Sequence, residues 1–160
     1  MSHFKPAQIP PEPEVRAQLR DPQPNAAVLS YLSQSPDPEG RAAVAAHPHR
    51  FVAGRDATLR LVRDPVQAVR AALAKNPRLS AAVAMQLADD PDGRVRQIIA
   101  GRPDTHPAIL SRLARDHALE VRWQVAQHPR IPVESQMRLL RDREPEVREA
   151  ASVRKLGRGR

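Results

Sequence analysis

Leucine, valine and alanine recur along the chain at a fixed spacing, and polar residues hold fixed positions between them. From residue 61 to residue 148 the pattern repeats every 26 residues. The repeated columns are Leu61, Leu87, Leu113 and Leu139; Asp64, Asp90, Asp116 and Asp142; Val69-Arg70, Val95-Arg96, Val121-Arg122 and Val147-Arg148; Ala74, Ala100 and Ala126; and Pro77, Pro103 and Pro129. Columns that keep one period over this length identify internal repeats.

Two looser copies lie upstream of this regular part. One copy matches the pattern 29 residues earlier, at Leu32, Arg41, Ala45 and Pro48. In that copy Gly40 stands where the other copies have valine. Val15-Arg16 and Pro22 form a truncated first copy. We therefore count six repeats, of which the outer two are incomplete.

Each repeat is expected to contain two short helices. Residues 69–74 predict the first helix, which ends before Pro77 because a residue that precedes proline is disfavoured in the helical region. Residues 81–88 predict the second, with Ser80 as its N-cap. Helices this short are unstable alone, because helix nucleation is costly. They must stack on those of neighbouring repeats, so the predicted fold is an all-α solenoid of about six two-helix repeats with a period near 26 residues.

The run Leu-Ala-x-Asp-x4-Val-Arg-x3-Ala-x-(Asn/His)-Pro resembles the variant leucine-rich repeat. It is clearest from Leu113 and Asp116 through Val121-Arg122 to His128-Pro129. The resemblance covers residues 13–153 and implies a right-handed solenoid in which an α-helix pairs with a second helix that is often 3₁₀. The Asp and Val-Arg columns also resemble HEAT-type repeats, for which 26 residues is short. Some relatives carry an N-terminal iron–sulfur cysteine cluster, which this cysteine-free chain cannot form.

The chain divides by sequence into three parts. Residues 1–12 are a proline-rich N-terminal segment, residues 13–153 are the repeat domain, and residues 154–160 are a basic, flexible tail. The length of 160 residues fits one domain. The net charge is +8, but the tail supplies four of these charges, so the rest of the chain carries only +4. The charge is thus weaker support for a nucleic-acid partner than its total implies.

Composition excludes several classes of function. Without cysteine there are no disulfides, thiolate metal sites or Cys nucleophiles. The six histidines lack metal-ligand spacing, and no phosphate-binding loop, nucleophile elbow or zinc-protease motif is present. We expect no cofactor, no metal, no small-molecule substrate and no enzyme activity. No apolar run approaches the roughly 20 residues that span a membrane, and no signal peptide is visible. The expected location is the cytoplasm.

The most regular charged feature is the column of arginines that follows the valines, which begins with Arg16 and Arg41. These guanidiniums could bind phosphates, or they could pair with the aspartates that recur in step with them. We favour a structural ladder, because an arginine fork and a carboxylate form a bidentate pair. The predicted ladder is Asp64, Arg70, Asp90, Arg96, Asp116, Arg122, Asp142 and Arg148.

A second basic feature follows the outer face of the second helices. One column reads Arg60, Gln86, Arg112, Arg138, and another reads Arg63, Asp89, Arg115, Arg141. On a helix these positions lie opposite the apolar face. The candidate site for a nucleic acid or another anionic partner is therefore Arg60, Arg63, Arg112, Arg115, Arg138 and Arg141, together with Arg154, Lys155, Arg158 and Arg160 in the tail. Gln86 and Asp89 interrupt the stripe, and an ordinary solvated face is the competing interpretation.

The sequence favours a non-catalytic repeat scaffold that binds a macromolecule, most readily a protein. The alternative is a nucleic-acid-binding solenoid that uses the arginine stripe and the tail. A more distant alternative is a DNA-repair protein of the HEAT-like glycosylase type. The last would need several aromatic side chains to stack bases, whereas Trp123 is the single tryptophan and is expected to fill core or inter-repeat space.

Overall fold

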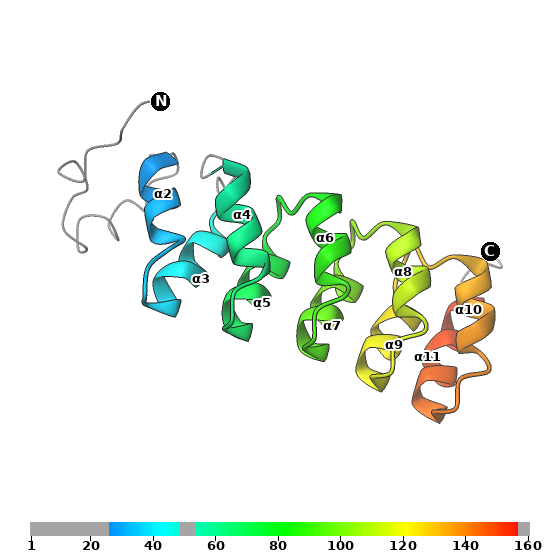
Figure 1. Ribbon diagram of the computed structural model, residues 1–160. Helices are drawn as coiled ribbons and strands as arrows, with labels where there is room; N and C mark the ends of the chain where they lie inside the picture. Colours follow the sequence, from blue (N-terminus) through cyan, green and yellow to red (C-terminus); the bar gives the residue numbers. More distant parts are fainter. Residues whose placement is uncertain (1–25, 49–53, 157–160) are drawn as a thin grey trace. The chain divides into compact units, whose positions relative to one another are not determined.

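The computed structural model describes residues 26–48 and 54–156; for residues 26, 54 and 154–156 it describes the backbone alone. Within these residues the chain forms ten helices and no strand (Figure 1), which confirms the all-α prediction. The helices are α2 (Ala26–Leu32), α3 (Pro38–Ala46), α4 (Gly54–Val62), α5 (Gln67–Lys75), α6 (Ala81–Leu87), α7 (Gly93–Gly101), α8 (Pro107–Leu113), α9 (Leu119–Ala126), α10 (Val133–Leu139) and α11 (Pro145–Leu156).

The chain divides into two compact units, Met1–Arg78 and Leu79–Arg160. The first contains α2 to α5 and the second contains α6 to α11. The predicted segment 1–12 lies outside the described residues. Residues 154–156, which the sequence assigned to the tail, belong to the last turn of α11.

Proline and the capping residues set the helix ends as the repeat predicted. Helix α5 ends at Lys75, and its C-cap Asn76 has an extended backbone before Pro77. Helix α7 ends in the same way before Pro103. Ser80 is the N-cap of α6, and its hydroxyl accepts a hydrogen bond from the Val83 amide at 3.4 Å. The steric effect of proline on the preceding residue therefore limits the first helix of each of these repeats.

Within the second unit, α6, α8 and α10 lie on one side, and α7, α9 and α11 lie on the other (Figure 1). Helix α9 packs against both α7 and α11, and α8 packs against α10, so consecutive helix pairs stack in chain order. In the first unit α3 packs against α5, and α2 packs against α4. Both units thus use the same helical-repeat packing.

The repeated apolar columns form the core of the described residues. The side chains of Leu87, Leu113 and Leu139 are at most 1% exposed, and the repeated valines and alanines are equally buried. Burying a leucine contributes about 1.5–3 kcal/mol, so these columns provide most of the packing between neighbouring helices. No helix in the described part of the chain is long and apolar enough to cross a membrane.

Candidate functional site

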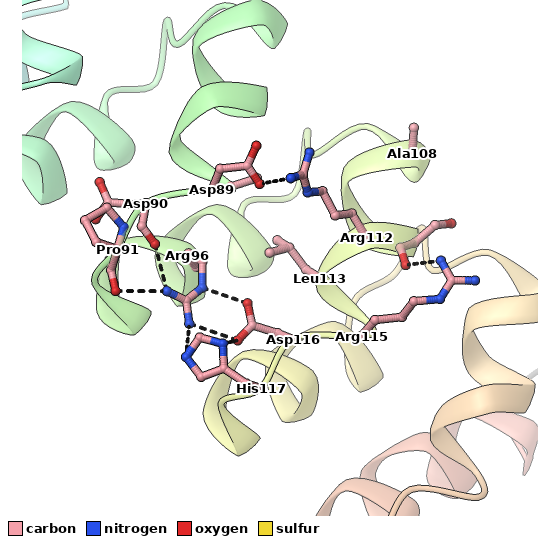
Figure 2. Close-up of a pocket in the computed structure, with 12 residues that line it drawn as sticks. Asp89, Asp90, Pro91, Arg96, Ala108, Arg112, Leu113, Arg115, Asp116 and His117 are labelled. Atoms are coloured by element: carbon pink, nitrogen blue, oxygen red, sulfur yellow. Dashed lines mark hydrogen bonds and ion pairs between the residues drawn. The ribbon is translucent and has the colours of Figure 1, made fainter.

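The guanidinium of Arg96, on α7, connects two successive repeats (Figure 2). Its Nε and Nη2 atoms donate to the carboxylate of Asp116 at 2.7 and 2.9 Å. Its Nη1 atom donates to the carbonyl oxygens of Asp90 and Pro91 at 2.7 and 3.2 Å. Both side chains of the ion pair are only 6% exposed. The Arg96 fork is therefore occupied by the protein itself.

The same arrangement recurs one repeat later. Nε and Nη2 of Arg122 donate to Asp142 at 2.7 and 3.0 Å, and Nη1 donates to the carbonyl oxygens of Asp116 and His117 at 2.9 and 3.0 Å. In the first unit, Arg41 forms the equivalent pair with Asp64 at 2.6 and 3.1 Å. We call these bonds the Asp–Arg ladder.

The remaining ladder arginines make the carbonyl contact of their own repeat. Nη1 of Arg70 donates to the carbonyl oxygen of Asp64 at 2.7 Å. Nη1 of Arg148 donates to the carbonyl oxygens of Asp142 and Arg143 at 2.7 and 2.9 Å, although Arg148 is exposed. Arg16 lies outside the described residues.

Each ladder aspartate also orders the loop that leads into the next helix. Oδ1 of Asp116 accepts a hydrogen bond from the Ala118 amide at 2.9 Å, and Asp142 does the same for the Glu144 amide at 3.0 Å. Burial alone would raise the pKa of Asp116, but the hydrogen bonds from Arg96 and Ala118 outweigh it and lower the pKa below its usual value. The same balance of burial against hydrogen bonds lowers the pKa of Asp142. Both carboxylates are thus held ionised.

Part of the arginine stripe on the second helices is paired with an acidic side chain. Arg112, on α8, forms an ion pair with Asp89, which follows α6 (Figure 2). Arg115 points away from this pair, and its Nη1 atom makes only a long contact of 3.5 Å with the Ser111 carbonyl oxygen. A groove of about 950 Å³ lies here between α6 and α8. Because Asp89–Arg112 and Arg96–Asp116 both line it, most of its charge is already compensated.

A second groove, of about 480 Å³, lies between α8 and α10, and we call it the α8/α10 groove. Its walls are Ala114, Arg115, Asp116, His117, Arg122, Arg138, Arg141, Asp142 and Arg143. Asp116 and Asp142 are engaged by the ladder, and Arg143 lies 3.3 Å from Glu144. Among the described residues no carboxylate pairs with Arg115, Arg138 or Arg141. This groove therefore carries uncompensated positive charge.

Two groove residues, His117 and Arg143, were not singled out in the sequence analysis. They occupy the position after the ladder aspartate, where the earlier repeats have Pro65 and Pro91. This position changes from proline to histidine and arginine in the last two repeats. A comparison of the repeats position by position would have identified the change, whereas a search for fixed columns did not.

The other predicted basic residues lie apart from this groove. Arg60 and Arg63 belong to the first unit and are exposed, and Nη2 of Arg60 donates to the Ser33 hydroxyl at 3.3 Å. Arg154 and Lys155 lie in the last turn of α11. Arg158 and Arg160 lie outside the described residues.

The residue that precedes the repeated proline has a structural role. Nδ2 of Asn76 donates to the carbonyl oxygens of Ala45 and His47 at 2.8 and 2.9 Å, and its Oδ1 accepts from the Arg78 amide. Two repeats later, at the equivalent position, Nε2 of His128 lies 2.7 Å from the Arg102 carbonyl oxygen. These buried side chains tie one repeat to the preceding one. No group of three or more potential metal-ligating side chains occurs in the described part of the chain.

Trp123 is not a core residue, so the expectation that it fills the core was wrong. It lies on α9 and is 39% exposed. The equivalent residues of the neighbouring repeats are Gln97 and Glu149. Gln97 is half-buried and Glu149 is exposed, so this position tolerates polar side chains in the neighbouring repeats.

Comparison of the chain with protein-family models, with curated proteins and with solved structures gives no significant match.

Proposed function

We propose that this chain is a non-catalytic helical-repeat scaffold that binds a protein through the exposed side of α8 and α10. We also propose that its repeats are of the variant leucine-rich type. One observation carries the functional proposal: the strictly repeated charged side chains are engaged within the protein, whereas Arg115, Arg138 and Arg141 are exposed and unpaired by any described carboxylate.

The bonding of the ladder supports a non-catalytic role. Both oxygens of Asp116 accept hydrogen bonds, from Arg96 and from the Ala118 amide. A general base needs a lone pair that a substrate proton can reach. The ladder carboxylates, which are the most regular acidic groups of the chain, have instead the environment of structural ion pairs.

The helices do not need the groove arginines in order to form. A cation in the last turn of a helix interacts favourably with the helix dipole. However, α6 has Gln86 and Asp89 at the positions that Arg112 and Arg115 occupy around the end of α8. Because α6 forms without these cations, Arg115, Arg138 and Arg141 are available for binding.

The surroundings of the arginines favour a protein over a nucleic acid. Val133 and Met137, both on α10, are 59% and 55% exposed. Apolar side chains of this kind pack against side chains of a partner, whereas a nucleic acid is held mainly through its phosphates. In addition, the Asp89–Arg112 pair removes one arginine from any phosphate-binding track.

A capture experiment tests the proposal. The full chain is immobilised and exposed to extract of its source organism, with and without nuclease, beside the variant Arg138→Gln/Arg141→Gln. The matched control is Arg94→Gln/Arg130→Gln, which removes the same charge from exposed residues outside the groove. We expect a nuclease-resistant protein that the groove variant loses and the control retains. Capture that disappears with nuclease would instead establish the nucleic-acid alternative.

A further inference from the structure

The partner chemistry of the α8/α10 groove follows from the groups on its surface, and this inference rests on the proposed function. The two carboxylates in its walls, Asp116 and Asp142, are each held by a ladder arginine within 2.7 Å. They therefore do not attract a cation and do not neutralise the remaining arginines. The uncompensated guanidiniums of Arg115, Arg138 and Arg141 are therefore available to an anionic ligand.

The positions of the arginines limit the ligand further. Arg115 follows the end of α8, while Arg138 and Arg141 lie at the end of α10. Axes of packed helices are about 8–10 Å apart. In a peptide with the extended polyproline II conformation, carboxylates three residues apart lie on the same side and are separated by about 9 Å, because three residues complete one turn and each advances the chain by about 3.1 Å. An extended segment with this acidic spacing can therefore contact both helix ends at once.

The surface beside the groove presents one apolar side chain and one acidic group. A hollow of about 470 Å³ on α10 is lined by Glu134, Met137, Arg138 and Arg141. Methionine is flexible and polarizable, so Met137 can accommodate apolar side chains of different shapes. Glu134, which also lines this hollow, disfavours a continuous polyanion across α10. The ligand should therefore be acidic over the arginines and apolar beside Met137.

Nothing in the groove supports recognition of nucleic-acid bases. Its walls contain no phenylalanine, tyrosine or tryptophan, whereas single-stranded nucleic acids are held largely by stacking of bases on such side chains. The three unpaired arginines come from only two helices and so offer few phosphate contacts. The positive charge of the groove and the exposed Met137 beside it together favour an acidic protein segment.

We infer that the α8/α10 groove binds an extended acidic segment of a protein. Two or more carboxylates about three residues apart contact Arg115, Arg138 and Arg141, and a neighbouring apolar side chain packs on Met137.

The test is a fluorescence-polarisation titration of the full chain with labelled synthetic peptides. The first peptide has glutamate at every third position and a leucine at one end. A second replaces each glutamate by glutamine, a third replaces the leucine by serine, and a fourth has the same composition with the glutamates adjacent. A single-stranded RNA and a duplex DNA of matched charge complete the series.

We expect the first peptide to bind more tightly than the other three. Arg138→Gln/Arg141→Gln should weaken its binding about tenfold, since two charge pairs of roughly 0.7 kcal/mol each are lost. Met137→Ser should weaken binding of the leucine peptide and not that of the serine peptide. The control Arg94→Gln/Arg130→Gln should bind as the unaltered chain does.

Three results would overturn the inference. These are equal binding of the glutamate and glutamine peptides, equal binding by the groove variant and the control, and a groove-dependent affinity that is higher for RNA or DNA than for the peptide. If the peptides do not bind but the capture experiment still yields a nuclease-resistant protein that depends on the groove, the acidic ligand is rejected and the scaffold proposal stands. Failure of both experiments would reject the scaffold proposal as well.

Discussion

Arg96 donates two hydrogen bonds, at 2.7 and 2.9 Å, to the carboxylate of Asp116, which lies 20 residues further along the chain. The third nitrogen of the same guanidinium holds the loop of its own repeat through the Asp90 carbonyl oxygen. One side chain thus fixes both the loop that precedes its helix and the next repeat. This dual contact explains why aspartate and arginine keep the same 26-residue period as the core.

Replacing Arg96 or Arg122 with alanine should destabilise the second unit by about 1–3 kcal/mol, because each leaves a nearly buried aspartate without its cation. Urea unfolding followed by circular dichroism measures this change. Arg94→Ala is the control, since this exposed residue should change the free energy of unfolding by less than about 0.5 kcal/mol. Unchanged stability in both ladder variants would mean that these arginines are free for ligands.

Stability should fall in acid because the pKa values of Asp116 and Asp142 are lowered in the folded protein. A lowered folded pKa contributes stability that is fully present above the unfolded value of about 3.9 and is lost as the pH falls through the folded value. The free energy of unfolding should therefore decline below about pH 4. Asp116→Asn and Asp142→Asn should lose stability at neutral pH and show a shallower acid decline. A decline as steep as in the unaltered chain would contradict this assignment.

A single substitution can separate the two hydrogen-bonding functions of Asn76, as acceptor and as donor. Asn76→Asp keeps an oxygen for the Arg78 amide but removes the donor to the carbonyl oxygens of Ala45 and His47. Loss of these buried bonds should cost about 1–3 kcal/mol. The thermal melting temperature reports this loss in the first unit. If Asn76→Asp melts with the unaltered chain, the residue serves only the turn before Pro77.

Binding to nucleic acid should be weak and governed by the tail. Deleting residues 157–160 and replacing Arg154 and Lys155 with alanine should remove most affinity for duplex DNA, because these residues supply four of the eight net positive charges. Replacing Arg112, Arg115, Arg138 and Arg141 with glutamine should change it little. The measurement is a salt titration, in which each phosphate contact contributes a log–log slope of about −0.9. A slope that flattens only in the glutamine variant would reverse this conclusion.

The fold was predictable because its strongest signals are local or periodic. Prolines after the first helices, the N-cap Ser80 and the buried leucine column each act within one repeat, so the sequence alone could place them. The pairing of aspartate with arginine was also predictable from their common period. Which repeat supplies the aspartate was not, because that depends on how successive helix pairs stack.

The candidate site was less predictable, because it depends on departures from the repeat. The stripe of arginines was identified, but the ion pair between Arg112 and Asp89 follows only from the packing of neighbouring helices. His117 was overlooked since its position in earlier repeats is proline. The exposure of Met137 and Trp123 likewise follows from their positions rather than from their hydrophobicity.

The most direct test compares melting temperatures with and without an excess of the glutamate–leucine peptide. A ligand that binds the folded state alone raises the melting temperature, and the rise grows with the logarithm of the ligand concentration relative to Kd. The unaltered chain and Arg94→Gln/Arg130→Gln should melt higher with the peptide. Arg138→Gln/Arg141→Gln should melt at the unaltered temperature without the peptide and show a smaller rise with it, because its affinity is about tenfold lower. A lower melting temperature of this variant alone, or a rise equal to that of the unaltered chain, would contradict a groove whose arginines serve binding rather than folding.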